Sequence, residues 1–162
     1  MTDGLLRVNT FEVAARHLCA WLEGPPMDPL HGMNTAIKLL SNIYSEAAQL
    51  QAIADEPPEI TAPTVCEEHL ESMQTRFEKF PLKRFELNTP FFPEDKNSIY
   101  NIFSTFSLIH QFIKTGLDYY DQGERDLAQN YWQQGFEKHW GKMLAGFIYA
   151  LHSYAEHLLE NN

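Results

Sequence analysis

Residues 97–120 read NSIYNIFSTFSLIHQFIKTGLDYY, and this stretch decides the fold class. Its apolar side chains recur every three or four residues, the spacing that places side chains on one face of an α-helix. A helix of this length reaches about 36 Å, and its apolar face needs neighbouring helices to cover it. The members of that face are Ile99, Ile102, Phe103, Phe106, Ile109, Ile113, Leu117 and Tyr120.

Patterns of the same period predict three helices upstream. Asn9, with a glutamate three residues later, indicates the start of a first helix over residues 10–23. Asp28 followed by Pro29 combines a helix N-cap with a first-turn proline and predicts a second helix. Thr64, again with a glutamate three residues on, predicts a capping box at the start of a third.

The remaining chain predicts a long loop and one more helical segment. Residues 81–97 contain three prolines and no regular period, so we expect an ordered loop held on the bundle by its aromatic rings. Those rings are Phe85, Phe91 and Phe92. Residues 124–159 are helical in pattern, with a bend or break expected near Gly141. Because no segment alternates apolar and polar residues, we expect no strand.

These patterns predict an all-α fold, a bundle of five to six helices in which residues 1–162 form a single domain. The predicted bundle has a long aromatic loop before the fourth helix and a helical hairpin towards the C-terminus. A chain of 162 residues can bury a core of its own, and 44% hydrophobic residues supply one. Within the hairpin segment GLDYYDQGERDLAQNYWQQGF (116–136), small residues should let two antiparallel helices approach closely.

Charge restricts the partners. Twelve Lys and Arg against 22 Asp and Glu give 12 − 22 = −10, which opposes binding to nucleic acid and to anionic lipid surfaces. The same charge attracts a basic protein. No apolar stretch is long enough to span a membrane or resembles a signal peptide, so we expect a cytoplasmic protein. Cys19 and Cys66 are expected to be two inward-facing free thiols.

The motifs of common catalytic and metal sites are missing from the sequence. It contains no GxSxG, no HExxH, no glycine-rich phosphate loop and no cysteine pair at zinc spacing. We therefore expect no enzyme activity, no catalytic residues, no cofactor and no metal.

His139 and Trp140 lie in GFEKHWGKM (135–143) and are candidates for a small-ligand pocket. At helical spacing His139 is in phase with Gly135 and Met143 on the apolar side of the last helix, which predicts that it faces inward. Glycines at this density weaken a helix, so we expect close packing of a neighbouring helix to compensate for them. A hydrogen-bonded structural histidine and a pocket-lining histidine both remain open.

The run from Ile102 to Tyr154 resembles an uncharacterised bacterial all-helical family, the domain of unknown function catalogued as 5063. The resemblance rests on GLDYYDQG, on FEKHWG at 136–141 and on ALH at 150–152. Upstream, LCAWLE and LLSNIYSEAAQL are similar to the first two helices of that family. In the fourth helix, NIFSTFSLIH lacks the acidic pair that the family tends to carry. The resemblance implies a helical domain and no particular activity.

Size, charge and the lack of catalytic motifs favour a protein-binding function. Our first hypothesis is an immunity protein that neutralises a basic toxin domain, because carboxylates can engage the cationic groups of a nuclease site. The residues expected to bind the partner are Asp55, Glu56, Glu59, Glu67, Glu68 and Glu71. Two alternatives remain, a helical protein with a small-ligand pocket near His139 and a structural homo-oligomer.

Overall fold

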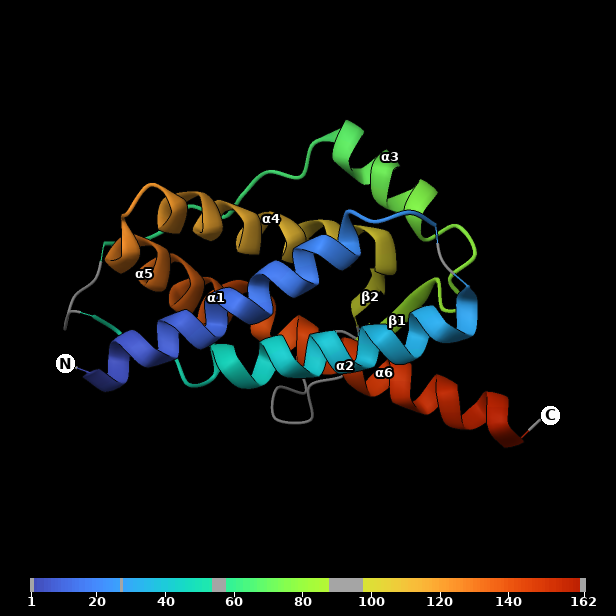
Figure 1. Cartoon of the computed structure of the whole chain (residues 1–162). Helices are drawn as coiled ribbons and strands as arrows, with labels where there is room; N and C mark the ends of the chain where they lie inside the picture. The colour runs from blue at the N-terminus through green and yellow to red at the C-terminus, as the bar shows by residue number, and fades with distance from the viewer. Residues whose placement is uncertain (1, 27, 54–57, 88–97, 161–162) are drawn as a thin grey trace.

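The computed structural model of the chain describes residues 2–26, 28–53, 58–87 and 98–160. These residues form a helical bundle with one small hairpin of strands, which confirms the predicted all-α fold (Figure 1). In chain order the elements are α1 (Thr2–Leu22), α2 (Pro29–Ala47), α3 (Glu67–Arg76), β1 (Arg84–Leu87), β2 (Ser98–Asn101), α4 (Ile102–Asp121), α5 (Arg125–Gly135), a π-helical turn (Phe136–Trp140) and α6 (Gly141–Glu160). None of the described helices is long and apolar enough to cross a membrane.

The helices are arranged around α1, which packs on both α2 and α4. The bundle is completed by α5, which lies against α4, and by α6, which lies against α2 (Figure 1). The short helix α3 packs on α4 and lies at the outer edge of the bundle. The interior between them is strongly aromatic. Its completely buried rings include Phe11, Phe77, Phe106, Phe112, Trp132, Trp140 and Phe147.

Of the predicted helix starts, only that of α2 is confirmed. Asp28 Oδ1 accepts a hydrogen bond from the His31 N–H at 3.0 Å, and Pro29 is the first helical residue. In α1 the helix begins at Thr2, so Asn9 lies inside it. The Asn9 Oδ1 instead accepts a hydrogen bond from the Tyr120 hydroxyl at 2.8 Å, so this side chain does not cap a helix.

The capping box predicted at Thr64 does not form. The residue before α3 is Cys66, whose side chain makes no capping hydrogen bond. The exposed acidic residues Glu67 and Glu68 occupy the first turn instead, where carboxylates interact favourably with the positive end of the helix dipole. The charge of the first turn thus takes the place of a side-chain cap.

The prediction of no strand is wrong. The strands β1 and β2 pair antiparallel with Phe85 opposite Tyr100, so this part of the predicted loop is a hairpin. Strand β2 also shortens the next helix, because Asn101 caps α4 by accepting from the Phe103 N–H at 2.8 Å. The period-two signal is short, because β1 alternates over only four residues and β2 carries exposed residues on both faces.

The predicted anchoring of the aromatic loop is confirmed at one ring. Phe85 is buried and stacks on Phe147 of α6, with ring centroids 4.9 Å apart. Phe91 and Phe92 lie outside the described residues. The hairpin of strands is therefore held on the bundle through β1, which packs on α6.

The turn between α4 and α5 forms the predicted helical hairpin. Gly123 in this turn has φ +86°, a conformation that favours glycine. Gly116 allows the two helices to nest, because a Cβ there would lie only 2.0 Å from Trp132 Nε1. That indole nitrogen donates to the Ile113 carbonyl oxygen at 3.2 Å, across the same interface.

Candidate functional site

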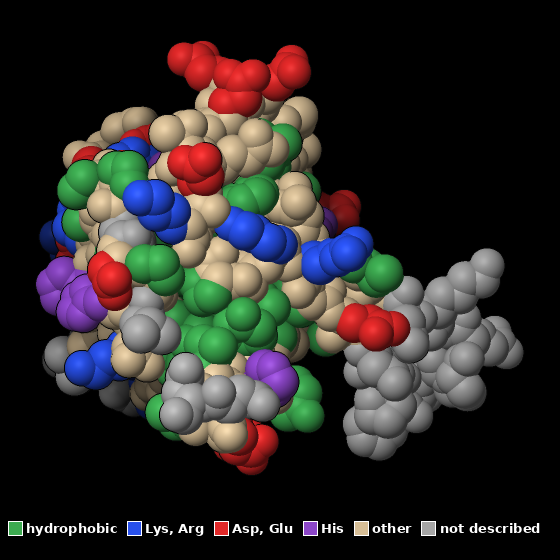
Figure 2. Space-filling view, turned by 90° about the vertical axis from the view of Figure 1, so that its right-hand side faces the viewer, with side chains coloured by type: hydrophobic (Ala, Val, Ile, Leu, Met, Phe, Trp, Pro, Cys, Tyr) green, Lys and Arg blue, Asp and Glu red, His purple; other side chains and the backbone are tan. Residues whose placement is uncertain are grey.

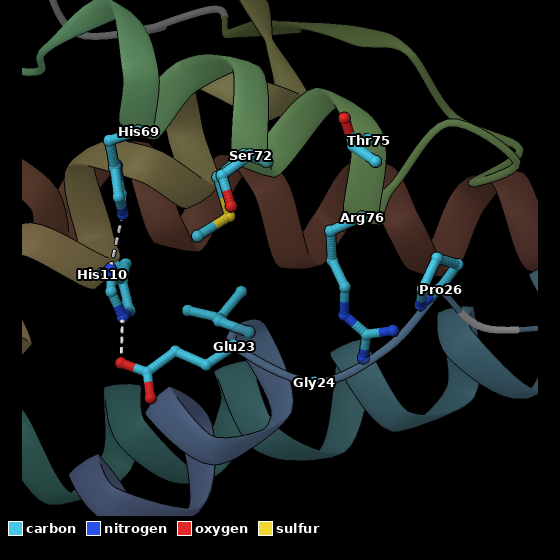
Figure 3. A pocket seen from close by; sticks show the side chains of 10 residues that line it. Glu23, Gly24, Pro26, His69, Ser72, Thr75, Arg76 and His110 are labelled. Carbon is cyan, nitrogen blue, oxygen red and sulfur yellow. Dashed lines mark hydrogen bonds and ion pairs between the residues drawn. The ribbon is translucent and has the colours of Figure 1, made fainter.

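A cavity of about 400 Å³ lies between the C-terminal end of α1, the inner face of α3 and α4 (Figure 3). Its walls combine apolar, hydroxyl and ionisable side chains from three segments that are far apart in the sequence. A volume of this size is within the usual range for small-molecule sites. The lining residues are Leu22, Glu23, Gly24, Pro26, His69, Ser72, Met73, Thr75, Arg76 and His110.

The inner face of α3 supplies most of the polar wall. His69, Ser72, Met73 and Arg76 follow one another at spacings of three, one and three residues, which places them on one side of the helix. Glu67 and Glu71 fall on the other side, and the exposed Glu68 falls between the two sides. Helix α3 therefore presents acidic groups outward and mixed polar groups to the cavity.

A hydrogen-bonded chain of four side chains runs along one wall. His69 Nε2 lies 2.7 Å from His110 Nδ1, and His110 Nε2 lies 2.9 Å from Glu23 Oε1 (Figure 3). At its other end, His69 Nδ1 contacts the hydroxyl of Ser107. Lys114 Nζ also reaches Glu23 Oε1 at 2.9 Å. The chain thereby connects α4 and α3 to the turn that follows α1.

The ionised carboxylate of Glu23 fixes the direction of every hydrogen bond in this chain. A carboxylate only accepts, so His110 Nε2 donates to it, and in a neutral His110 ring Nδ1 then accepts. His69 Nε2 then donates to His110, and its Nδ1 accepts from the Ser107 hydroxyl. Both imidazoles are neutral in this arrangement, and every ring nitrogen has a partner.

The electrostatic environment favours the same protonation states. Burial lowers the pKa of His110, although its hydrogen bond to Glu23 acts in the opposite direction. Burial also lowers the pKa of His69, and the neighbouring His110 lowers it further. For Glu23, burial acts to raise the pKa, but hydrogen bonds from Lys114 and His110 outweigh it, and the pKa stays below its ordinary value.

Arg76 is the unusual group of the site. Its side chain is almost completely enclosed, with 8% of the residue exposed, and its guanidinium lies 5.9 Å from the Trp21 ring centroid and 5.5 Å from that of Phe77. Nη2 donates to the Trp21 carbonyl oxygen at 2.8 Å, near the end of α1. Nε and Nη1 are buried without a hydrogen-bond partner among the described residues. Burial lowers the pKa of Arg76.

The hydroxyl group of the hydrogen-bonded chain does not open onto the cavity. Ser107 is the hydroxyl member of the chain, and it is completely buried beneath α3. Within the described part of the protein, no three His, Cys, Asp or Glu side chains are grouped as metal ligands. Ser107 therefore helps to hold α3 on α4, and it is not among the residues that line the cavity.

The acidic residues predicted to bind a partner are only partly brought together. Glu67, Glu68 and Glu71 are exposed on α3, and acidic side chains gather at the top of the molecule in Figure 2, where α3 lies. Glu59 is exposed on the segment before α3 and lines a different cavity. Asp55 and Glu56 lie outside the described residues.

His139 does not face inward as predicted; it is exposed. The cause is the π-helical turn, in which the Gly141 N–H donates to the Phe136 carbonyl oxygen five residues back. The wider turn moves the inward-facing position one residue along the chain, so Trp140 is buried instead of His139. The His139 ring stacks on Phe112 of α4 at 5.4 Å, and neither His139 nor Trp140 lines the cavity below α3.

The predicted close packing around the glycines is present at Gly135. A Cβ at that position would lie 2.9 Å from the Phe112 ring of α4. At Gly146 the close neighbour belongs to a strand, since a Cβ would lie 2.3 Å from Leu87 Cδ1 of β1. The close packing that compensates for these two glycines therefore comes from α4 at Gly135 and from β1 at Gly146.

The two cysteines differ from each other. Cys19 is buried in α1 as predicted, and burial, followed by the nearby Glu23 carboxylate, raises the pKa of its thiol to about 12. Cys66 is exposed at the start of α3, so its predicted inward position is wrong. The residue precedes the helix, and the helical phase used to place it therefore does not apply.

The cavity residues could not be predicted from the sequence because they lie on three separate segments of the chain. Ser107, His110 and Lys114 form a polar line at spacings of three and four along α4, a signal that the sequence does contain. Glu23 and His69 could not be joined to that line before the helices were placed in space.

Two comparisons with known proteins find matches, one to a protein family and one to a solved structure. The family described as a domain of unknown function, DUF5063, matches residues 7–157. The chain belongs to this family. Its fold is also similar to the crystal structure of protein BF1032 from Bacteroides fragilis, with 25% sequence identity, a TM-score of 0.67 and coverage of 91% of this chain and 94% of that one. A search among curated proteins finds no match.

The family match confirms the predicted resemblance and extends it over nearly the whole described chain. Residues 7–157 include α3 and the end of α1, so the cavity lies within the family's domain. The family description carries no activity, and the function of this member has to be argued from its own residues.

Proposed function

We propose that this member of the family is a non-enzymatic, cytoplasmic binding protein that docks a basic protein on the outer face of α3. An immunity protein that neutralises a basic toxin domain is the form of this function that we favour. The observation that carries the proposal is the group Glu67, Glu68 and Glu71, three exposed carboxylates within five residues of one helix.

Charge supports this docking face. The protein carries a net charge of −10, and a basic partner would be drawn to it by long-range attraction. Among the described residues, no cation forms an ion pair with any of the three carboxylates. Their charge is therefore available to a partner's Lys and Arg side chains.

The position of α3 in the bundle also supports docking of a basic partner on its outer face. The helix lies at the outer edge of the bundle and turns its other face to the cavity and to α4 (Figure 1). A partner can cover the acidic side without displacing a core residue. His69 and Arg76, which hold α3 to α4 and α1, fix the carboxylates on a supported surface rather than on a free segment.

The experiment is a binding measurement with a basic toxin domain encoded next to this protein. Association rates are measured at low and moderate salt for the natural chain and for a Glu67→Lys, Glu68→Lys, Glu71→Lys triple variant. We expect the triple variant to associate slower by about tenfold or more, and salt to slow the natural chain most.

The matched control is a Glu137→Lys, Glu156→Lys, Glu160→Lys variant, which changes net charge equally at exposed carboxylates outside α3. We expect it to lose much less of the association rate than the α3 variant. Equal effects of the two triple variants, or no binding by the natural chain, would refute docking on α3.

A further inference from the structure

The cavity beneath α3 contains a buried cation that has no counter-ion. Arg76 remains charged at neutral pH, and no carboxylate of the described chain lies within ion-pairing distance of it. Buried charges in proteins are generally paired, because removing an ion from water is costly. The nearest acidic group on the wall, Glu23, is already shared by Lys114 and His110.

The guanidinium has hydrogen-bonding capacity left over. One nitrogen, Nη2, is used by the Trp21 carbonyl oxygen, while Nε and Nη1 have no partner. The rings of Trp21 and Phe77 lie close to the guanidinium, so their packing holds it in place without satisfying its N–H groups. Arg76 forms part of the cavity wall, so a ligand in the cavity lies next to the side chain that carries these donors.

We propose that this cavity binds a small organic monocarboxylate whose carboxylate group pairs with Arg76. Guanidinium and carboxylate match in charge and in planar geometry and form two parallel hydrogen bonds. The hydroxyl groups of Ser72 and Thr75 line the same cavity and can donate to the ligand's oxygens. This site is independent of the docking of a basic partner on the opposite face of α3.

The other residues of the cavity wall limit the charge and the chemical class of the ligand. A single buried cation matches one negative charge, and the Glu23 carboxylate on the wall disfavours a doubly charged phosphate. Leu22 and Met73 provide apolar contacts for a short hydrocarbon body. The cavity, at about 400 Å³, has room for a ligand of several carbon atoms.

The test uses nuclear magnetic resonance of the ¹⁵N-labelled full chain with sodium hexanoate, hexanamide and inorganic phosphate as probes. We expect hexanoate to give saturable shifts at the backbone amides of Gly24, Ser72 and Arg76. Hexanamide has the same body without the charge and should bind about tenfold more weakly, as should phosphate. Absence of saturable hexanoate shifts, or equal or tighter binding of either comparator, would overturn the proposal.

Substitutions in the cavity wall test whether hexanoate binds in this cavity. Arg76→Gln should weaken hexanoate binding by about tenfold or more, the loss expected for a charge-assisted pair. Because this change also removes the hydrogen bond to Trp21, Ser72→Leu provides a second test that fills the cavity and leaves the guanidinium intact. Gln74→Leu is its matched control, since Gln74 is exposed on α3 and does not line the cavity. Hexanoate binding that is equal in the Ser72→Leu and Gln74→Leu variants would show that the ligand lies elsewhere.

Discussion

His69 of α3 and His110 of α4 are joined directly, with 2.7 Å between Nε2 of the first and Nδ1 of the second. Their rings are nearly parallel, with centroids 4.9 Å apart. Because His110 also donates to Glu23, the residue that follows α1, this pair connects α3 and α4 to the end of α1. The contact needs an unprotonated nitrogen on at least one of the two rings, so protonation of both rings would break it and the position of α3 is linked to pH.

We predict that the free energy of unfolding falls as the pH is lowered from about 7 to 5. Both histidines have a lowered pKa in the folded protein, chiefly because they are buried. The unfolded chain therefore takes up protons near the ordinary histidine pKa of about 6.5 while the folded chain does not. Stability is full above that pH and is lost below it. Urea unfolding at several pH values measures the effect.

A His69→Gln, His110→Gln double variant should flatten this pH dependence. His17→Gln, His31→Gln is the control, since both of those histidines are exposed. Glu23 contributes with the same sign only at lower pH, because its pKa lies below the ordinary carboxyl value. An unchanged slope between pH 5 and 7 in the double variant would contradict the assignment to this pair.

Gly116→Ala should destabilise the protein by about 1 to 3 kcal/mol or more through overpacking. The added methyl group would lie 2.0 Å from Trp132 Nε1, so α4 and α5 would have to separate or the buried indole would have to move. Thermal unfolding with the Gly123→Asn variant as control measures this. Asn tolerates the positive φ of Gly123, and nothing lies within 4 Å of the position of its Cβ. Equal stability of the natural chain and Gly116→Ala would show that this contact is wrong.

Trp140→Ala should destabilise by about 3 to 5 kcal/mol, and His139→Ala by about 1 kcal/mol or less. The difference follows from the π-helical turn, which buries Trp140 completely and leaves His139 exposed against Phe112. Chemical denaturation of the two variants provides the comparison. If His139→Ala were the more damaging change, an uninterrupted α-helix through Gly141 would be the better description.

Cys66 should react with iodoacetamide in the folded protein, and Cys19 only after unfolding. Cys66 is exposed, whereas burial raises the pKa of the Cys19 thiol to about 12 and keeps it protonated. Mass spectrometry of the alkylated protein, in buffer and in denaturant, counts the labelled thiols. Rapid labelling of both cysteines in buffer would contradict the burial of this part of α1.

The elements that could be predicted from the sequence are those governed by local rules. Asp28 with Pro29 starts α2 because an N-cap and a first-turn proline act within a few residues. Asn9 and Thr64 match similar local rules and fail. Asn9 has its partner on α4, and the acidic first turn of α3 begins beyond Thr64.

The sequence by itself determined the helical class, the apolar faces, the hairpin at Gly116 and the family, because helical period and glycine placement are properties of neighbouring residues. Tertiary structure alone decided the cavity beneath α3. Glu23 follows α1, His69 lies on α3 and His110 lies on α4, and periodicity specifies which face of a helix is buried but not which element covers it. The inward residue of the last segment was likewise decided by one π-helical turn, which changes the helical phase without a corresponding signal in the spacing of apolar residues.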